Sequence, residues 1–121
     1  MAKDYIQIDI TSVQQPVEQA NGLANAHYID PATFAEESEA VLKSTWAGLA
    51  VGADVPNLGD AKPIQFLGMP LLLIRDKDGE LRVFENICRH RGMQLLHEAK
   101  TIEGAIRCPY HSWCYSTKGK L

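Results

Sequence analysis

The fold of this chain is decided by two short stretches, Cys88-Arg89-His90 and Cys108-Pro109-Tyr110-His111. Each stretch offers one thiolate and one imidazole within a few consecutive residues. Seventeen residues, from Arg91 to Arg107, separate the two pairs. Because both stretches combine the same two donor types, the spacing predicts one metal site built from two loops.

Two cysteines and two histidines are the ligand set of a [2Fe–2S] cluster in which one iron binds the cysteines and the other the histidines. The predicted ligands are Cys88 and Cys108 for an inner iron, and His90 and His111 for an outer, exposed iron. Neutral imidazoles make the oxidised centre less negative than four thiolates would. The reduction potential then rises from about −400 mV to roughly −150 to +300 mV. The pattern therefore predicts one cluster that transfers electrons.

Two other interpretations of these residues stay open. Zinc also binds two cysteines with two histidines, although its usual spacing groups cysteine with cysteine and histidine with histidine. Alternatively, two unrelated buried cysteines could stand beside incidental histidines. The remaining candidates match neither pair: we expect Cys114 to be a small buried residue, and His27 and His97 to be surface or packing residues.

Around these loops the chain resembles the N-terminal Rieske domain of ring-hydroxylating, non-haem iron oxygenase α subunits. The similar stretches are residues 86–92 and 107–115, and the resemblance extends over residues 28–121. Upstream, residues 28–31 and Trp46 are similar to the helical lead-in of these subunits. Family members often have glycine where this chain has Ser112.

The respiratory-complex kind of Rieske protein differs in two ways. Its loops are joined by a disulfide whose cysteines would stand at Met93 and Tyr110, and it has a serine donor to a cluster sulfur at the position of Trp113. Fewer donors to sulfur leave the reduced state less stabilised. The resemblance therefore implies a low-potential oxygenase or ferredoxin type. A tyrosine matching Tyr115 bonds a cysteine sulfur in related domains, and core packing is the alternative role for it here.

The resemblance implies electron transfer within an oxidoreductase that hydroxylates an aromatic or other small organic substrate with O₂. The implied electron donor is a reductase or a ferredoxin. The implied acceptor is a mononuclear Fe(II) in a C-terminal domain, usually that of a neighbouring subunit in a homotrimer. Since no residues here match that second iron site, we expect a truncated mono- or dioxygenase component that is inactive alone.

A free-standing Rieske ferredoxin, an electron carrier that is not an enzyme, is the alternative. Such a carrier normally begins near its first strand, without a lead-in such as residues 1–47, so the oxygenase is favoured. Arg89 and Arg91 flank the outer histidine, either as surface charge or as a docking face for an acidic redox partner. The substrate contacts would lie outside these residues.

The patterning predicts an N-terminal arm and helix over residues 1–47, followed by a Rieske [2Fe–2S] domain over residues 48–121. The arm, residues 1–26, is polar and is expected to be extended. Asp30-Pro31 predicts a helix N-terminus, with Asp30 as the cap. We expect Trp46 to pack this helix against a sheet.

The second part is predicted to be mainly β, with antiparallel sheets and two hairpin loops that carry the cluster. Predicted strands are residues 64–67, 71–75, 81–87, 105–107 and 113–115, with turns at 76–79 and 118–119. A Rieske domain normally needs further strands, so we expect this one to be incomplete at its C-terminus.

Composition argues against several other classes of protein. The net charge is −3 and there is no basic run, which disfavours nucleic acid as a partner. No stretch approaches the roughly eighteen apolar residues of a membrane span, and the N-terminus lacks the apolar core of a signal peptide. Of three cysteines, two are assigned to iron. No disulfide pair is left, which predicts a cytoplasmic protein.

Overall fold

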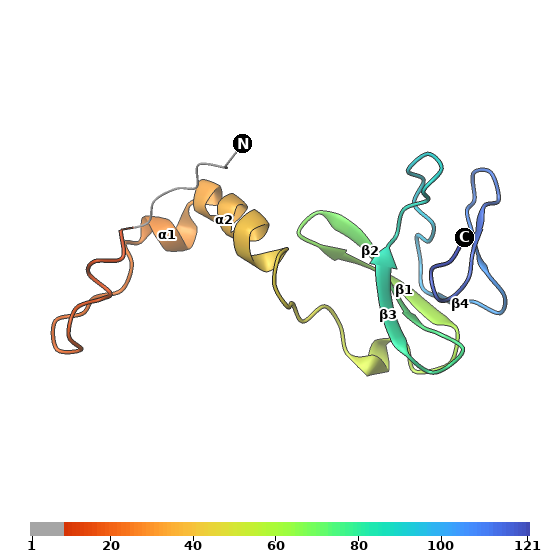
Figure 1. Ribbon diagram of the computed structural model, residues 1–121, viewed down its shortest axis with the longest axis horizontal. Helices are drawn as coiled ribbons and strands as arrows, with labels where there is room; N and C mark the ends of the chain where they lie inside the picture. Colours follow the sequence, from red (N-terminus) through yellow and green to blue (C-terminus); the bar gives the residue numbers. More distant parts are fainter. Residues whose placement is uncertain (1–8) are drawn as a thin grey trace. The chain divides into compact units, whose positions relative to one another are not determined.

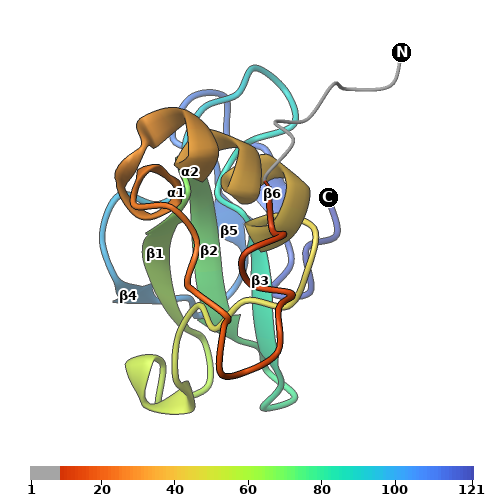
Figure 2. The same cartoon turned by 90° about the vertical axis from the view of Figure 1, so that its left-hand side faces the viewer.

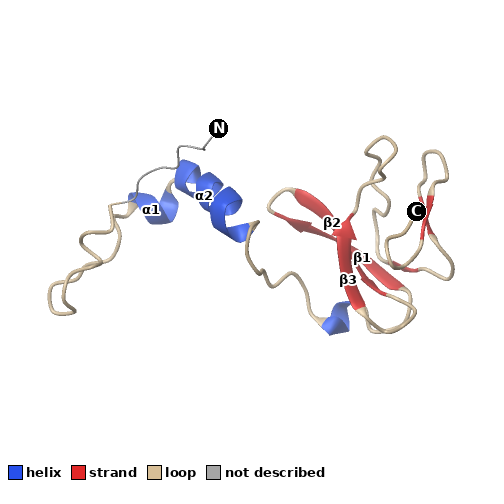
Figure 3. Ribbon diagram, viewed as in Figure 1, coloured by secondary structure: helices blue, strands red, loops and turns tan. Residues whose placement is uncertain are grey.

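The computed structural model describes residues 9–121. The chain divides into two compact units, Met1–Ala47 and Gly48–Leu121 (Figure 1). Apart from one short turn of 3₁₀ helix in the second unit, η2 (Gly52–Asp54), helices belong to the first unit and strands to the second (Figure 3). No helix within residues 9–121 is long and apolar enough to cross a membrane.

The predicted extended arm is wrong for residues 10–21, which fold back in two turns. The N–H of Gln14 donates to Ile10 O at 3.1 Å, and the N–H of Ala20 donates to Pro16 O at 2.8 Å. Local side chains favour these turns, because the Asp9 carboxylate accepts from the Thr11 N–H at 2.9 Å and proline presets φ. Residues 1–8 of the arm lie outside the described residues.

The helical part of the first unit consists of α1 (Ala26–Ile29), α2 (Pro31–Glu37) and a π-helical turn, η1 (Ser38–Leu42). Helix α2 begins as predicted: Pro31 occupies the first turn, and the Asp30 carboxylate accepts from the Thr33 N–H at 3.2 Å. Trp46 is fully exposed. Its packing against the sheet stays a prediction.

The second unit contains a four-stranded antiparallel sheet, which confirms the predicted mainly β fold (Figure 2). Its strands are β1 (Asp60–Phe66), β2 (Met69–Arg75), β3 (Leu81–Glu85) and β4 (Lys100–Thr101), in the order β3-β2-β1-β4. Tight turns join the first three strands. Leu67 and Gly68 both have positive φ, 47° and 79°, and Gly79 closes the next turn with φ 89°. The two-residue strand β4 was not predicted, because it is too short to show a pattern.

The second hairpin consists of β5 (Ile106–Arg107) and β6 (Cys114–Tyr115), each shorter than predicted. After β6, the N–H of Gly119 donates to Ser116 O at 2.9 Å and closes another turn. Gly119 has φ 82°, and a Cβ there would lie 2.7 Å from the Phe84 ring. The turn predicted at residues 118–119 therefore packs directly on the sheet and needs glycine.

The core of the second unit lies where the sheet meets the second hairpin. Its fully buried members include Leu72 and Ile74 on β2, and Cys88 and Cys108 belong to the same cluster of buried side chains. The cysteines are therefore held by the packing that stabilises the fold.

Candidate metal centre

The first loop follows β3 and is closed by a bridge between Ile87 and Gln94. Within it, the N–H of Cys88 donates to Met93 O at 2.7 Å, and the N–H of Gly92 donates to Cys88 O at 2.9 Å. Gly92 takes φ 71°, in the left-handed region. The loop is thus a tight turn whose first residue is the cysteine.

The second loop repeats this hydrogen-bond pattern between β5 and β6. The N–H of Cys108 donates to Trp113 O at 2.8 Å, and the N–H of Ser112 donates to Cys108 O at 3.1 Å. Ser112 stands four residues after its cysteine, as Gly92 does in the first loop, and takes φ 61°. This conformation favours glycine, so Ser112 adopts it at an energetic cost. The two loops project side by side (Figure 1).

The four predicted ligands come together as two pairs of like residues. Cys88 and Cys108 are 1% and 2% exposed and belong to the same cluster of buried side chains. His90 and His111 are exposed at the loop tips, where their Nδ1 atoms lie 3.1 Å apart. The sulfur donors are thus at the inner end of the site and the nitrogen donors at the outer end.

This division fits a binuclear cluster. Metal–imidazole bonds of about 2.0–2.1 Å allow two nitrogens 3.1 Å apart to bind the same ion. Among residues 9–121, no three Cys, His, Asp or Glu side chains converge on one point where a metal could sit. One cysteine pair and one histidine pair are what a cluster with mixed ligation requires, whereas a single zinc needs its four donors around one centre.

Hydrogen-bond donors surround the sulfur of Cys88. The Tyr115 hydroxyl lies 3.2 Å from it, and that hydroxyl oxygen accepts from the Arg89 N–H at 3.0 Å. The Tyr115 hydroxyl, followed by the N–H groups of His90 and Arg91, lowers the pKa of the Cys88 thiol. The bond to Cys88, with burial, raises the pKa of Tyr115. Because its oxygen already accepts from the Arg89 N–H, the Tyr115 hydroxyl has its proton available for the Cys88 sulfur, while its ring packs in the core.

Aromatic rings cover both histidines, which the sequence interpretation missed. Trp113 stacks on His90 with ring centroids 4.8 Å apart and planes at 9°, and Tyr110 stacks on His111 at 3.7 Å and 27°. From the sequence, Trp113 marks only the position of an absent serine donor to sulfur and the start of a strand. The available signal was an aromatic residue on either side of His111 in the second motif, with Tyr110 directly before it and Trp113 two residues after it.

Asn86 is a second residue whose role was missed. It is fully buried, its Nδ2 donates to Leu96 O at 2.7 Å, and its Oδ1 accepts from the Leu96 N–H at 2.9 Å. These two bonds join the ends of the segment that carries the first loop. A polar residue directly after an apolar strand was the available signal.

The predicted burial of Cys114 is wrong. It is exposed, and its thiol donates to Ser112 O at 3.2 Å. Side chains alternate along a strand, so Cys114 points outward because its neighbour Tyr115 points into the core. His97 is exposed, as predicted, and His27 is half-buried in the first unit.

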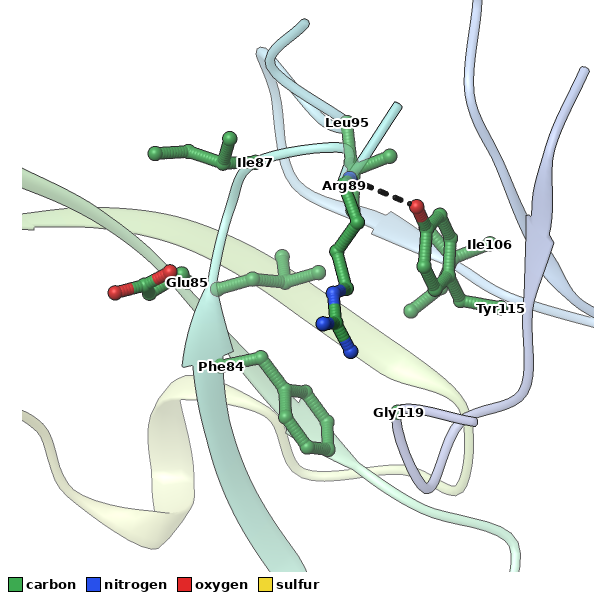
Figure 4. A pocket seen from close by; sticks show the side chains of 9 residues that line it. Phe84, Glu85, Ile87, Arg89, Leu95, Ile106, Tyr115 and Gly119 are labelled. Carbon is green, nitrogen blue, oxygen red and sulfur yellow. Dashed lines mark hydrogen bonds between the residues drawn. The ribbon is translucent and has the colours of Figure 1, made fainter. Parts of the chain in front are cut away.

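A pocket of about 200 Å³ lies beside the first loop. Its lining is mainly apolar and includes Phe84 and Leu95, with Glu85 at one side. Figure 4 shows the Arg89 side chain reaching across it toward Phe84, while the Arg89 N–H donates to Tyr115. The long Arg89 side chain therefore lies along the pocket.

The second unit is similar to a known family of domains. The family model described as the Rieske [2Fe-2S] domain matches residues 45–121. The chain is 32% identical over 101 residues to the glycine betaine monooxygenase oxygenase subunit of Chromohalobacter salexigens, covering 84% of this chain and 23% of that protein. It is 31% identical over 107 residues to the anthranilate 1,2-dioxygenase large subunit of Acinetobacter baylyi, covering 88% and 23%.

Solved structures show the same similarity. A quaternary ammonium Rieske monooxygenase superposes with a TM-score of 0.76 at 32% identity, covering 84% of this chain and 29% of that one. Naphthalene 1,2-dioxygenase from Rhodococcus sp. superposes with a TM-score of 0.72 at 35% identity, covering 80% and 22%. The chain thus spans about a quarter of the length of the curated relatives it matches.

Proposed function

Because the chain belongs to the Rieske [2Fe–2S] domain family, we propose that its two cysteine–histidine pairs hold one [2Fe–2S] cluster. The four ligands are Cys88, His90, Cys108 and His111. The observation that carries this proposal is their arrangement as a buried cysteine pair and an exposed histidine pair.

A bound cluster would accept and release one electron at a time. The chain's own residues would prepare the site for the added negative charge. The Tyr115 hydroxyl and the N–H groups of His90 and Arg91 are directed at the Cys88 sulfur, and such donors stabilise the reduced state. The apolar core keeps water away from the cysteines. The exposed histidines leave the outer end accessible to a redox partner.

We further assign this electron transfer to an oxygenase component. The chain would receive electrons from a reductase or ferredoxin and supply them to a mononuclear iron, usually in a neighbouring subunit of a trimer. The relatives described above are oxygenase subunits, and another solved relative, at 33% identity, is described in terms of inter-subunit electron transfer. These relatives favour the oxygenase over a free-standing ferredoxin.

Anaerobic reconstitution with iron and sulfide tests the cluster. The expected product contains two irons and two sulfides per chain. After reduction it should give the EPR signal of a [2Fe–2S] centre with nitrogen and sulfur ligands. Stoichiometric zinc without acid-labile sulfide would refute the proposal.

Two cysteine variants supply a matched comparison. Cys108→Ser removes a buried proposed ligand, and we expect it to abolish the EPR signal. Cys114→Ser changes the exposed cysteine of the same hairpin and should retain the full iron and sulfide content. Loss of the cluster in both variants, or in neither, would contradict the ligand assignment.

A further inference from the structure

The two aromatic rings that cover the histidines differ in whether they belong to the same loop as the histidine they contact. Tyr110 is the chain neighbour of His111, so their stack lies within the second loop. Trp113 also belongs to the second loop, but it stacks on His90 of the first loop. The near-parallel contact of Trp113 with His90 is therefore a link between the loop tips.

A histidine at a loop tip needs a contact that fixes the plane of its ring. Rotation about the last side-chain torsion of histidine is soft. Metal-binding histidines ordinarily gain their orientation from a hydrogen bond to the second ring nitrogen. Within residues 9–121, the rings of His90 and His111 hydrogen-bond only to each other, through Nδ1. Over this part of the chain, that mutual bond and ring stacking restrict their rotation, and the mutual bond is lost if these nitrogens bind iron.

The indole is itself held in place. Trp113 is exposed at a loop tip, with 37% of its surface accessible. Its carbonyl accepts from the Cys108 N–H at 2.8 Å. The backbone of Trp113 is thereby tied to one buried cysteine, while its side chain lies on the histidine of the opposite loop.

We propose that Trp113 is a positioning residue for His90, and that its indole sets the plane of the imidazole and joins the tips of the two loops. Tyr115 makes the corresponding link at the buried end, where it contacts Cys88 and Arg89. This assignment rests on the proposed cluster, because it concerns the orientation of one of its ligands.

The test compares Trp113→Phe with Trp113→Leu in the full chain, reconstituted anaerobically. Phenylalanine keeps a flat ring, whereas leucine keeps apolar bulk without one. Each variant is measured by iron and sulfide content, by EPR g values, by the two histidine ¹⁴N hyperfine couplings and by midpoint potential.

We expect Trp113→Phe to match the parent. Trp113→Leu should change the ¹⁴N coupling of one histidine, leave that of the other unchanged, and shift the midpoint potential. Faster loss of the cluster from Trp113→Leu than from Trp113→Phe would also support the role of the ring. Trp46→Phe, in the first unit, controls for the loss of a tryptophan as such.

Several outcomes would overturn the assignment. One is a Trp113→Leu chain with full iron and sulfide content whose ¹⁴N couplings and midpoint potential equal those of the parent. Another is an equal change in these quantities in Trp113→Leu and Trp113→Phe. Urea unfolding of the cluster-free chains is compared as well. If only Trp113→Leu fails to fold, the role of Trp113 is structural and the assignment is wrong. If the parent itself binds no [2Fe–2S] cluster, it is the proposed function that fails.

Discussion

The hydroxyl of Tyr115 bonds the sulfur of Cys88 at 3.2 Å and also accepts from the Arg89 N–H at 3.0 Å, across more than two dozen positions of sequence. One side chain on β6 thus holds both a proposed ligand and the backbone beside it. The contact joins the second hairpin to the first loop.

Tyr115→Phe should lower the reduction potential. Loss of a donor to sulfur leaves the negative charge of the reduced state less stabilised. A net hydrogen bond of about 1 kcal/mol corresponds to roughly 40 mV in a one-electron couple. A redox titration followed by EPR measures the shift. Tyr110→Phe removes the hydroxyl of an exposed tyrosine and should leave the potential unchanged.

His111→Cys should lower the potential further, provided that a cluster still forms. A thiolate in place of a neutral imidazole makes the oxidised centre more negative, which moves it toward the range of about −400 mV seen for clusters with four cysteines. His97→Cys, at an exposed histidine outside the site, is the matched control. An unchanged potential in His111→Cys would mean that this residue is not a ligand.

Ser112→Gly and Gly92→Ser should change stability in opposite directions. Both positions have positive φ, 61° and 71°, and a residue with a Cβ pays about 1 kcal/mol or more for that conformation. We expect Ser112→Gly to raise the free energy of unfolding in urea and Gly92→Ser to lower it. Nothing lies within 4 Å of a Cβ built at Gly92, so conformation and not crowding would cause the loss.

Asn86→Ala should destabilise the segment that carries the first loop by roughly 1–3 kcal/mol, because the Leu96 N–H loses its partner while the Leu96 carbonyl keeps only its bond from Gln94. Urea unfolding measures the loss, and amide exchange should locate it between residues 86 and 96. Gln94→Ala removes a half-buried donor to the same Leu96 carbonyl and should cost less. Equal losses would show that Asn86 has no special role.

Asp76 should make the fold sensitive to acid. Its side chain is fully buried, and its bond to Arg82, followed by the N–H groups of Asp78 and Glu80, holds its pKa below the usual value. Because folding lowers the pKa of this carboxyl, its ionised form stabilises the fold. This contribution is fully present above the ordinary aspartate pKa of about 4. That stability is lost as the pH falls through the pKa that Asp76 has in the folded state.

Asp76→Asn should therefore reduce stability at pH 7 and flatten its decline between pH 5 and pH 2, as judged by urea unfolding of the cluster-free chain. Asp78→Asn changes the same charge at an exposed position of the same turn, where it pairs with Lys118. A decline as steep in Asp76→Asn as in the parent would show that another group governs it.

Much of the fold could be predicted because it depends on neighbouring residues. The Asp30 cap, the turn ending at Gly79 and the first three strands follow from local backbone chemistry. Other elements could not. Cys114 was expected to be buried, but burial depends on which face of β6 meets the core. The arm was expected to be extended, yet side chains such as Asp9 favour turns.

The sequence by itself determined which side chains could bind a metal and that two loops would carry them, because donor type and spacing belong to the covalent chain. The inner cysteine pair and the outer histidine pair were expected from the ligand set, and the tertiary structure brings each pair together. Only the tertiary structure decided which cysteine Tyr115 reaches and that Trp113 covers His90. These contacts join residues far apart in sequence. They form only because the second hairpin packs on the sheet.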